Sequence, residues 1–187
     1  PFDVPDAAGN FVAQNVTDGS TRDVFGQNYW LGRQGRINES FVLDLGQVVR
    51  IEEIRLRNTH NTQHNDRGTA NFEIWASQSV DSAKQPVTPV RILAGRLSDV
   101  MGLDPIPDDV FTSANGLLLT NTRYLKFVAL TANNAANNVG LNEIEVYAPS
   151  FSGPDRAYSF DGNLNDRSGS AIAGQNMGTT FSTNVPS

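Results

Sequence analysis

Hydrophobic residues recur at every second position over several short stretches of the chain. Phe72, Ile74 and Ala76 alternate with polar residues in one stretch, and Leu125 and Phe127 do so in another. This period of two indicates half-buried antiparallel strands, and no stretch has the pattern of a long amphipathic helix. The predicted strands cover residues 40–46, 48–58, 71–77, 90–95, 116–120, 123–131 and 141–148. Many short strands separated by Gly, Asn, Asp and Pro predict an all-β fold, either a sandwich or a jelly roll.

The pattern of strands ends near residue 148. Residues 1–148 are therefore predicted to form one β-sandwich. Residues 149–155 (PSFSGPD) have the composition of a linker, with two prolines, a glycine and two serines. Residues 156–187 contain few large apolar side chains and are too short for a core of their own. They are either the start of a second, truncated domain or a segment that packs on the first.

Composition and charge narrow the classes of function. The formal net charge is −6, which disfavours nucleic acid and anionic lipid as partners. No apolar run is long enough to span a membrane, so we expect no membrane insertion. The chain has no cysteine and cannot form a disulfide.

A polar turn, NVTDGSTRDVFGQNYW, precedes the first strong strand. It offers oxygen atoms from Asp18, Ser20, Thr21 and Asp23, and Gly19 permits a sharp bend. Calcium prefers such oxygen ligands, so the turn is a candidate metal site. The alternative is an Asx-turn whose side chains bond to their own backbone.

Five segments in this order resemble the discoidin, or coagulation-factor 5/8 C-type, family: NVTDGSTRD, SFVLDLGQVVRIEEIRLRN, NFEIWAS, RYLKFVALTANN and VGLNEIEVYA. The resemblance runs from about Val12 to Ala148. The family includes many galactose-binding carbohydrate modules, and the resemblance implies a jelly-roll β-sandwich with ligand loops at one end. It also implies structural calcium in the polar turn, with Glu143 completing the ligands. The segment YSFDGNLNDRSG resembles the opening of a concanavalin A-like, laminin-G-like domain, which would make residues 156–187 its N-terminal fragment.

Two departures refine the resemblance. The animal clotting members close the domain with a disulfide, which this chain cannot form, so it is more similar to the bacterial modules. The candidate loops are polar, which disfavours phospholipid. Alternation places Glu143 opposite Ile144 and Val146, and a carboxylate that is buried there needs a positive partner. A solvent-facing Glu143 would need none.

Both histidines lie in one polar loop, NTHNTQHNDRG. His60 and His64 with Asp66 supply three of the ligands that zinc would need, and either histidine is a possible general base. No nucleophile motif accompanies them, so we expect no catalysis. Arg67 either contacts a ligand or forms a brace with Asp66 that holds the loop.

A sugar site is the favoured interpretation of this loop. His60, His64 and Arg67 would bond to sugar hydroxyls, and Asn138 from a later loop would add to them. Tyr29 would stack on a sugar ring. Trp75 is a second possible platform unless residues 77–90 cover it.

The sequence therefore predicts a non-catalytic, extracellular or cell-surface recognition module that binds glycans or cell-surface glycoproteins and carries structural calcium. One alternative is a structural or adhesion subunit that contacts other copies or subunits in a surface assembly. Another is a targeting appendage of a glycoside hydrolase whose catalytic domain lies elsewhere.

Overall fold

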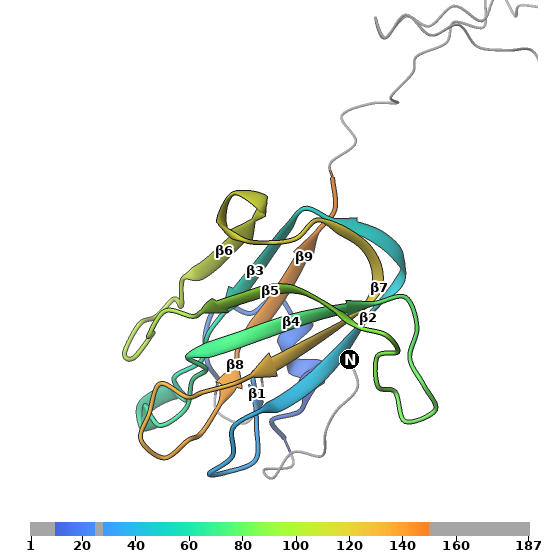
Figure 1. Ribbon diagram of the computed structural model, residues 1–187. Coiled ribbons are helices and arrows are strands. Elements are labelled where there is room, and N and C mark those ends of the chain that lie inside the picture. Colours follow the sequence, from blue (N-terminus) through green and yellow to red (C-terminus); the bar gives the residue numbers. More distant parts are fainter. Residues whose placement is uncertain (1–9, 25–27, 150–187) are drawn as a thin grey trace, which may run out of the picture. The chain divides into compact units, whose positions relative to one another are not determined.

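The computed structural model describes residues 10–24 and 28–149 (Figure 1). They form an all-β sandwich, as the alternating pattern predicted. The expectations for the linker after Pro149 and for residues 156–187 lie outside the described residues. No helix in the described part is both long and apolar enough to cross a membrane.

The sandwich consists of a four-stranded sheet with the order β2-β7-β4-β5, a three-stranded sheet with the order β6-β3-β9, and the short pair β1-β8. All strand pairs are antiparallel. The strands are β1 (Trp30–Leu31), β2 (Glu39–Ile51), β3 (Glu53–Arg57), β4 (Asn71–Ser77), β5 (Val90–Arg96), β6 (Asp108–Thr112), β7 (Thr120–Ala129), β8 (Gly140–Leu141) and β9 (Glu143–Tyr147). Three short 3₁₀ turns are η1 (Ala13–Thr17), η2 (Thr62–His64) and η3 (Ser113–Asn115).

The structure differs from the predicted strands in several places, among them the unpredicted β1 and the division of the strand predicted at 141–148 into β8 and β9. The strand predicted at 40–46 and the start of the next one form a single strand, β2, whose pairing with β7 shifts between Asp44 and Val49. Gly46 lies inside this irregularity with a φ of +80°, a conformation that glycine adopts without strain. The sequence also misses β6, and residues 117–119 of the predicted strand at 116–120 lead into β7 instead.

Phenylalanine rings fill the space between the sheets. Phe127 on β7 stacks on Phe41 and on Phe72, with ring centroids 5.2 and 5.8 Å apart. Trp30 meets Phe127 edge-on. These rings come from three neighbouring strands and from β1, and they pack in one core with buried Leu, Ile and Val side chains.

The chain changes sheets at one end of the sandwich. β3 belongs to the three-stranded sheet and β4 to the four-stranded sheet, so residues 58–70 cross this end. Residues 130–139, which follow β7, lie at the same end (Figure 1). The backbone of Asn133 donates to the carbonyl of Gly68, so the two loops are in contact there.

The central position of Phe127 gives a first prediction. We expect Phe127→Ala to lower the free energy of unfolding by about 3–5 kcal/mol, because it removes a ring that packs against three others. Leu118→Ala is the control, because this leucine is 54% exposed and should cost under about 1 kcal/mol. Denaturant melts of both variants check the difference, and equal losses would contradict this description of the core.

Candidate functional site

Asn58 fixes the base of the loop between β3 and β4. Its fully buried side chain accepts hydrogen bonds from the backbones of Thr59 and Thr69, both at 3.0 Å. It donates to the carbonyls of Thr69 and Ser98, both at 2.9 Å. Because every donor and both lone pairs of this amide are used, the two ends of the loop are held together without a disulfide.

The carboxylate of Asp23 organises the first half of the same loop. Its Oδ2 accepts from the hydroxyl of Thr59 at 2.7 Å and from the backbone N–H groups of His60 and Asn61, both at 2.9 Å. Its Oδ1 accepts from the side chain of Asn142 at 3.0 Å. The side chain is only 1% exposed. Asp23 therefore acts as a buried anion held in a nest of N–H groups, and these bonds set the path of the loop.

Asp23 is thus directed away from the turn in which the sequence placed a cation. The other acidic residue of that turn, Asp18, bonds to its own backbone, accepting from the N–H of Ser20 at 2.8 Å. Glu143 on β9 is far from the turn in sequence but contacts it in space. Its Oε2 accepts a hydrogen bond from the N–H of Gly19 at 3.2 Å. The structure therefore brings Asp18 and Glu143 together, although 124 positions separate Gly19 from Glu143.

Glu143 is a buried carboxyl group with a perturbed pKa. It is 3% exposed. Burial, and then the negative charge of Asp18, raise the pKa of Glu143 from 4.5 to about 8, and the N–H of Gly19 and the charge of Arg57 offset this only in part. A carboxyl group in this position is stabilised either by a proton or by a cation.

Several other oxygens of the turn take part in hydrogen bonds. The hydroxyl of Ser20 accepts from Asn28 and donates to the carbonyl of Arg22, while the Ser20 carbonyl accepts from Arg57 at 2.7 Å. The carbonyl of Thr21 accepts from Ile106. Within residues 10–24 and 28–149, no group of three or more His, Cys, Asp or Glu side chains is arranged to hold a metal ion. The carboxylates of Asp18 and Glu143 are therefore the part of the turn that fits a cation.

The two histidines have different environments. Nδ1 of His60 lies 2.7 Å from the carbonyl of Thr62, and its Nε2 lies 3.8 Å from Asp23, so the ring is engaged inside the loop. His64 is exposed at the end of η2, with its Nε2 3.4 Å from the amide of Gln63. Within the described residues, the two histidines and Asp66 are not arranged as a zinc centre.

Tyr29 and Asn138 are buried in the scaffold of this end. Tyr29 is fully buried, packs on Phe11, and its hydroxyl lies 2.6 Å from Oδ1 of Asn61, to which it donates. Asn138 is 3% exposed and its Oδ1 accepts from the backbone of Gly35 at 2.8 Å. Neither side chain presents itself to a ligand, so their role is to position the loops.

Arg67 lies at the contact between the two loops. Its side chain is 14% exposed, and its Nε is 4.0 Å from Asp66, too far for a hydrogen bond. Asp66 instead accepts from the amide of Asn61 at 2.6 Å. The tight Arg–Asp brace is therefore absent, and both Nε and Nη1 of Arg67 are buried without a hydrogen-bond partner among the described residues.

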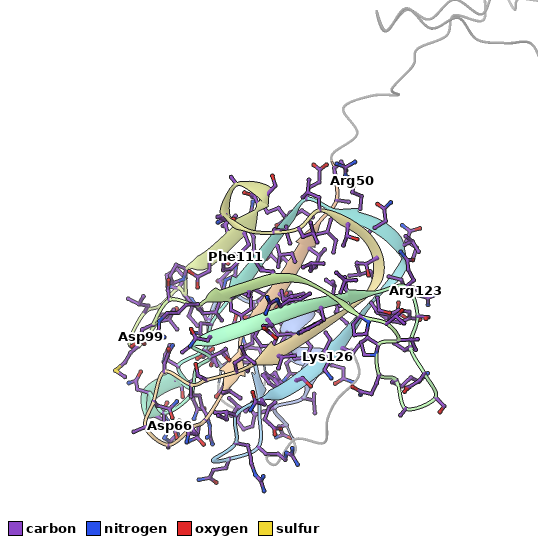
Figure 2. The ribbon with its side chains drawn as sticks, viewed as in Figure 1. Arg50, Asp66, Asp99, Phe111, Arg123 and Lys126 are labelled. Atoms are coloured by element: carbon purple, nitrogen blue, oxygen red, sulfur yellow. The ribbon has the colours of Figure 1, made fainter. Side chains whose placement is uncertain are left out.

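Other unpartnered polar atoms gather in the same two loops. Seven buried side-chain atoms lack a hydrogen bond in the described part of the chain, and five of them belong to these loops. The five are Nε and Nη1 of Arg67, Oγ1 of Thr62, Oδ1 of Asn65 and Oδ1 of Asn133. Leaving such a group unsatisfied costs about 1–3 kcal/mol, so these two loops carry most of the unmet hydrogen-bonding capacity among the described buried side chains. Figure 2 shows the labelled Asp66 at this end of the sandwich and Arg50 at the other.

Sequence reasoning missed Asn58, Asn133 and Asn142 as organising residues of this site. Each stands in an Asn-rich segment where a single amide has no distinguishing signal. A partial signal existed at two of these positions. Asn58 directly follows β3 and Asn142 directly precedes β9, and polar side chains at strand ends often bond to the backbone of the adjoining loop.

No family model matches this chain, and no curated protein is significantly similar in sequence. Solved structures with the same fold are found, all at low identity. One is chitosan-binding module 1 of a chitosanase/glucanase from Paenibacillus sp. IK-5, with 16% identity and a TM-score of 0.51 over 74% of this chain and 86% of that one.

Two further neighbours were solved with sugars. A family 32 module (CBM32-5) from Clostridium perfringens, in complex with GalNAc-β-1,3-galactose, has 16% identity and a TM-score of 0.53 over 79% of this chain and 91% of that one. A second family 32 module, bound to GalNAc, has 12% identity and a TM-score of 0.51 over 75% and 89%. These likenesses confirm the jelly-roll β-sandwich of the galactose-binding type that the sequence predicted.

Proposed function

We propose that this chain is a non-catalytic carbohydrate-binding module whose ligand site is formed by residues 58–68 and 130–139. The observation that carries the proposal is the largely buried guanidinium of Arg67, in which two nitrogens have no hydrogen-bond partner among the described residues. The side-chain oxygens of Asn65, Asn133 and Thr62 are unpartnered acceptors in the same two loops. A sugar hydroxyl both donates and accepts, so it is the ligand that satisfies both kinds of group.

Similar folds support the choice of ligand class. The sugars in structures of the neighbours include GalNAc-β-1,3-galactose, galactose, GalNAc, fucose and 4,5-unsaturated mannuronic acid. His64 at the exposed end of η2 and His60 inside the loop extend the polar surface toward the ligand. The proposed ligand is a free glycan or the glycan of a cell-surface glycoprotein. Because such ligands lie outside the cell, we propose an extracellular location for the module.

The second element of the proposal is a structural calcium ion at the polar turn. The carboxylates of Asp18 and Glu143 would hold it, with oxygens of Ser20 and Thr21 beside them. Support comes from the buried Glu143, which faces a second carboxylate across the fold. Such an ion would tie the turn to β9 and take no part in chemistry, and Asp23 would serve the loop instead.

A second candidate function is targeting of a glycoside hydrolase. One structural neighbour derives from a chitosanase/glucanase. In this reading the same site binds the same class of ligand and concentrates an attached enzyme on it. The parent reading frame distinguishes the two readings.

Arg67 provides the direct test. We expect Arg67→Ala to weaken binding of the best glycan from an array by at least about tenfold, because a charge-assisted hydrogen bond is worth about 1.5–3 kcal/mol. Arg50→Ala is the matched control, since Arg50 is 57% exposed and lies at the other end of the sandwich. Titration calorimetry measures both. Absence of any glycan ligand for the wild type would overturn the proposal and favour an assembly protein. Equal affinity of the Arg67 variant would overturn the assignment of the site to these loops.

Asp23 tests the positioning of the loop. Asp23→Asn keeps the shape of the side chain but removes the negative charge of the carboxylate, which accepts hydrogen bonds from Thr59, His60 and Asn61. We expect the amide protons of His60 and Asn61 to exchange at least about tenfold faster, since bonds to a charged acceptor are worth about 1.5–3 kcal/mol. The affinity of the same variant for the glycan should also fall. Unchanged exchange at both amides would show that the carboxylate does not hold the loop.

Glu143 tests the cation. Its folded pKa lies above its unfolded value, so the metal-free protein binds an extra proton between about pH 4.5 and 8 and loses stability as pH rises through this window. We expect the chelated protein to melt at lower temperature at pH 8 than at pH 5, and calcium to restore the melting temperature at pH 8. Glu143→Gln should flatten both responses. A melting temperature that calcium leaves unchanged at pH 8 would exclude the structural ion.

A further inference from the structure

A separate cavity lies on the outer face of the four-stranded sheet, away from the loops that surround Arg67. It has a volume of about 250 Å³ and is lined by Trp75, Gln85, Pro86, Pro89, Lys126 and Val128. Trp75 is paired with Lys126 across β4 and β7, and Glu73 is paired with Val128, so these four side chains share one face of the sheet. Figure 2 shows Lys126 on β7, well separated from Asp66 at the loop end.

The indole of Trp75 has a fixed orientation in this cavity. Its Nε1 donates to Oε2 of Glu73 at 3.1 Å, and Oε1 of Glu73 accepts from Arg91 at 2.6 Å. The polar edge of the ring is therefore satisfied, and the ring is partly exposed. Such a ring is a pre-oriented apolar platform, the kind of surface on which the C–H face of a pyranose stacks.

The wall opposite the sheet is also braced. Residues 78–89 connect β4 to β5, and Asp81 accepts at one oxygen from the backbones of Ala83 and Gln85, at 2.9 and 2.8 Å. The hydroxyl of Ser77 donates to the carbonyl of Val87 at 2.6 Å. Because these bonds hold the wall in place before any ligand arrives, binding would cost little ordering of the loop.

Lys126 supplies a positive charge at the rim. Its Nζ donates to the neutral amide of Gln85 at 3.0 Å, and it makes no ion pair within the described residues. Glu73, an acidic side chain on the same face, is already paired with Arg91. An ammonium group has three N–H donors, so Lys126 can bind an anion while it keeps its bond to Gln85. This positive rim stands out in a chain whose net charge is −6.

We propose that this cavity is a second ligand site, which binds a pyranose bearing a carboxylate, with the sugar ring on Trp75 and the carboxylate on Lys126. The site uses different residues and a different face from the loops around Arg67. It therefore stands or falls independently of the proposed function.

Tryptophan fluorescence tests the proposal directly. The chain has two tryptophans, and Trp30 is buried in the core, so a ligand-induced change in emission reports on Trp75. We expect a saturable change with methyl β-D-glucuronide and at least about tenfold weaker binding of the matched neutral sugar, methyl β-D-glucoside. Trp75→Phe should remove the signal.

Three variants locate the ligand. Lys126→Gln should weaken glucuronide binding at least about tenfold, because it removes the charge that faces the carboxylate. Lys84→Gln, which changes the other lysine of the chain, and Arg67→Ala should bind as the wild type does. No saturable change, equal affinity for the two sugars, or wild-type affinity in the Lys126 variant would overturn the proposal. Loss of the signal in the Arg67 variant would also overturn it, since the sugar would then occupy the other site.

Discussion

The buried carboxylate of Asp23 is the interaction on which the loop end of this sandwich depends. It accepts from the hydroxyl and N–H groups of a loop that follows β3, and from Asn142, which precedes β9. One charged group therefore joins three separate parts of the chain. Without it, several N–H groups of the loop would be buried and unpaired, and each such group costs about 1–3 kcal/mol.

This anchoring explains why Arg67 has unpartnered donors. Asp66, its sequence neighbour and the expected partner, is engaged by Asn61, and Asn61 is held in turn by Tyr29. Asp66 and Asn61 thus bond to other parts of the scaffold, and neither pairs with the guanidinium of Arg67. A buried, preoriented Arg is an energetic liability in the free protein and an advantage on binding a polar ligand. The same logic applies to Lys126, which bonds to a neutral amide instead of a carboxylate.

The strands were more predictable from the sequence than the site. Alternation identifies β4 and β7 because their apolar residues face one core, whereas β6 begins with two aspartates and carries no such pattern. Tyr29 was expected to face a ligand, but it is fully buried just before β1, and this two-residue strand is too short to show an alternating pattern. The resemblance of the polar turn to a metal-binding turn correctly brought Glu143 near Asp18. It could not tell whether Asp23 serves the polar turn or the loop after β3, because the bonds of Asp23 to that loop join residues more than thirty positions apart.

The most direct measurement of the central claim is an NMR titration of the labelled protein with its best glycan ligand. The side-chain Nε–H signal of Arg67 and the side-chain amide signals of Asn65 and Asn133 report on the atoms that lack partners in the free protein. Our account predicts that these signals shift together and saturate with the same affinity. Binding that leaves the Arg67 signal unmoved would contradict it.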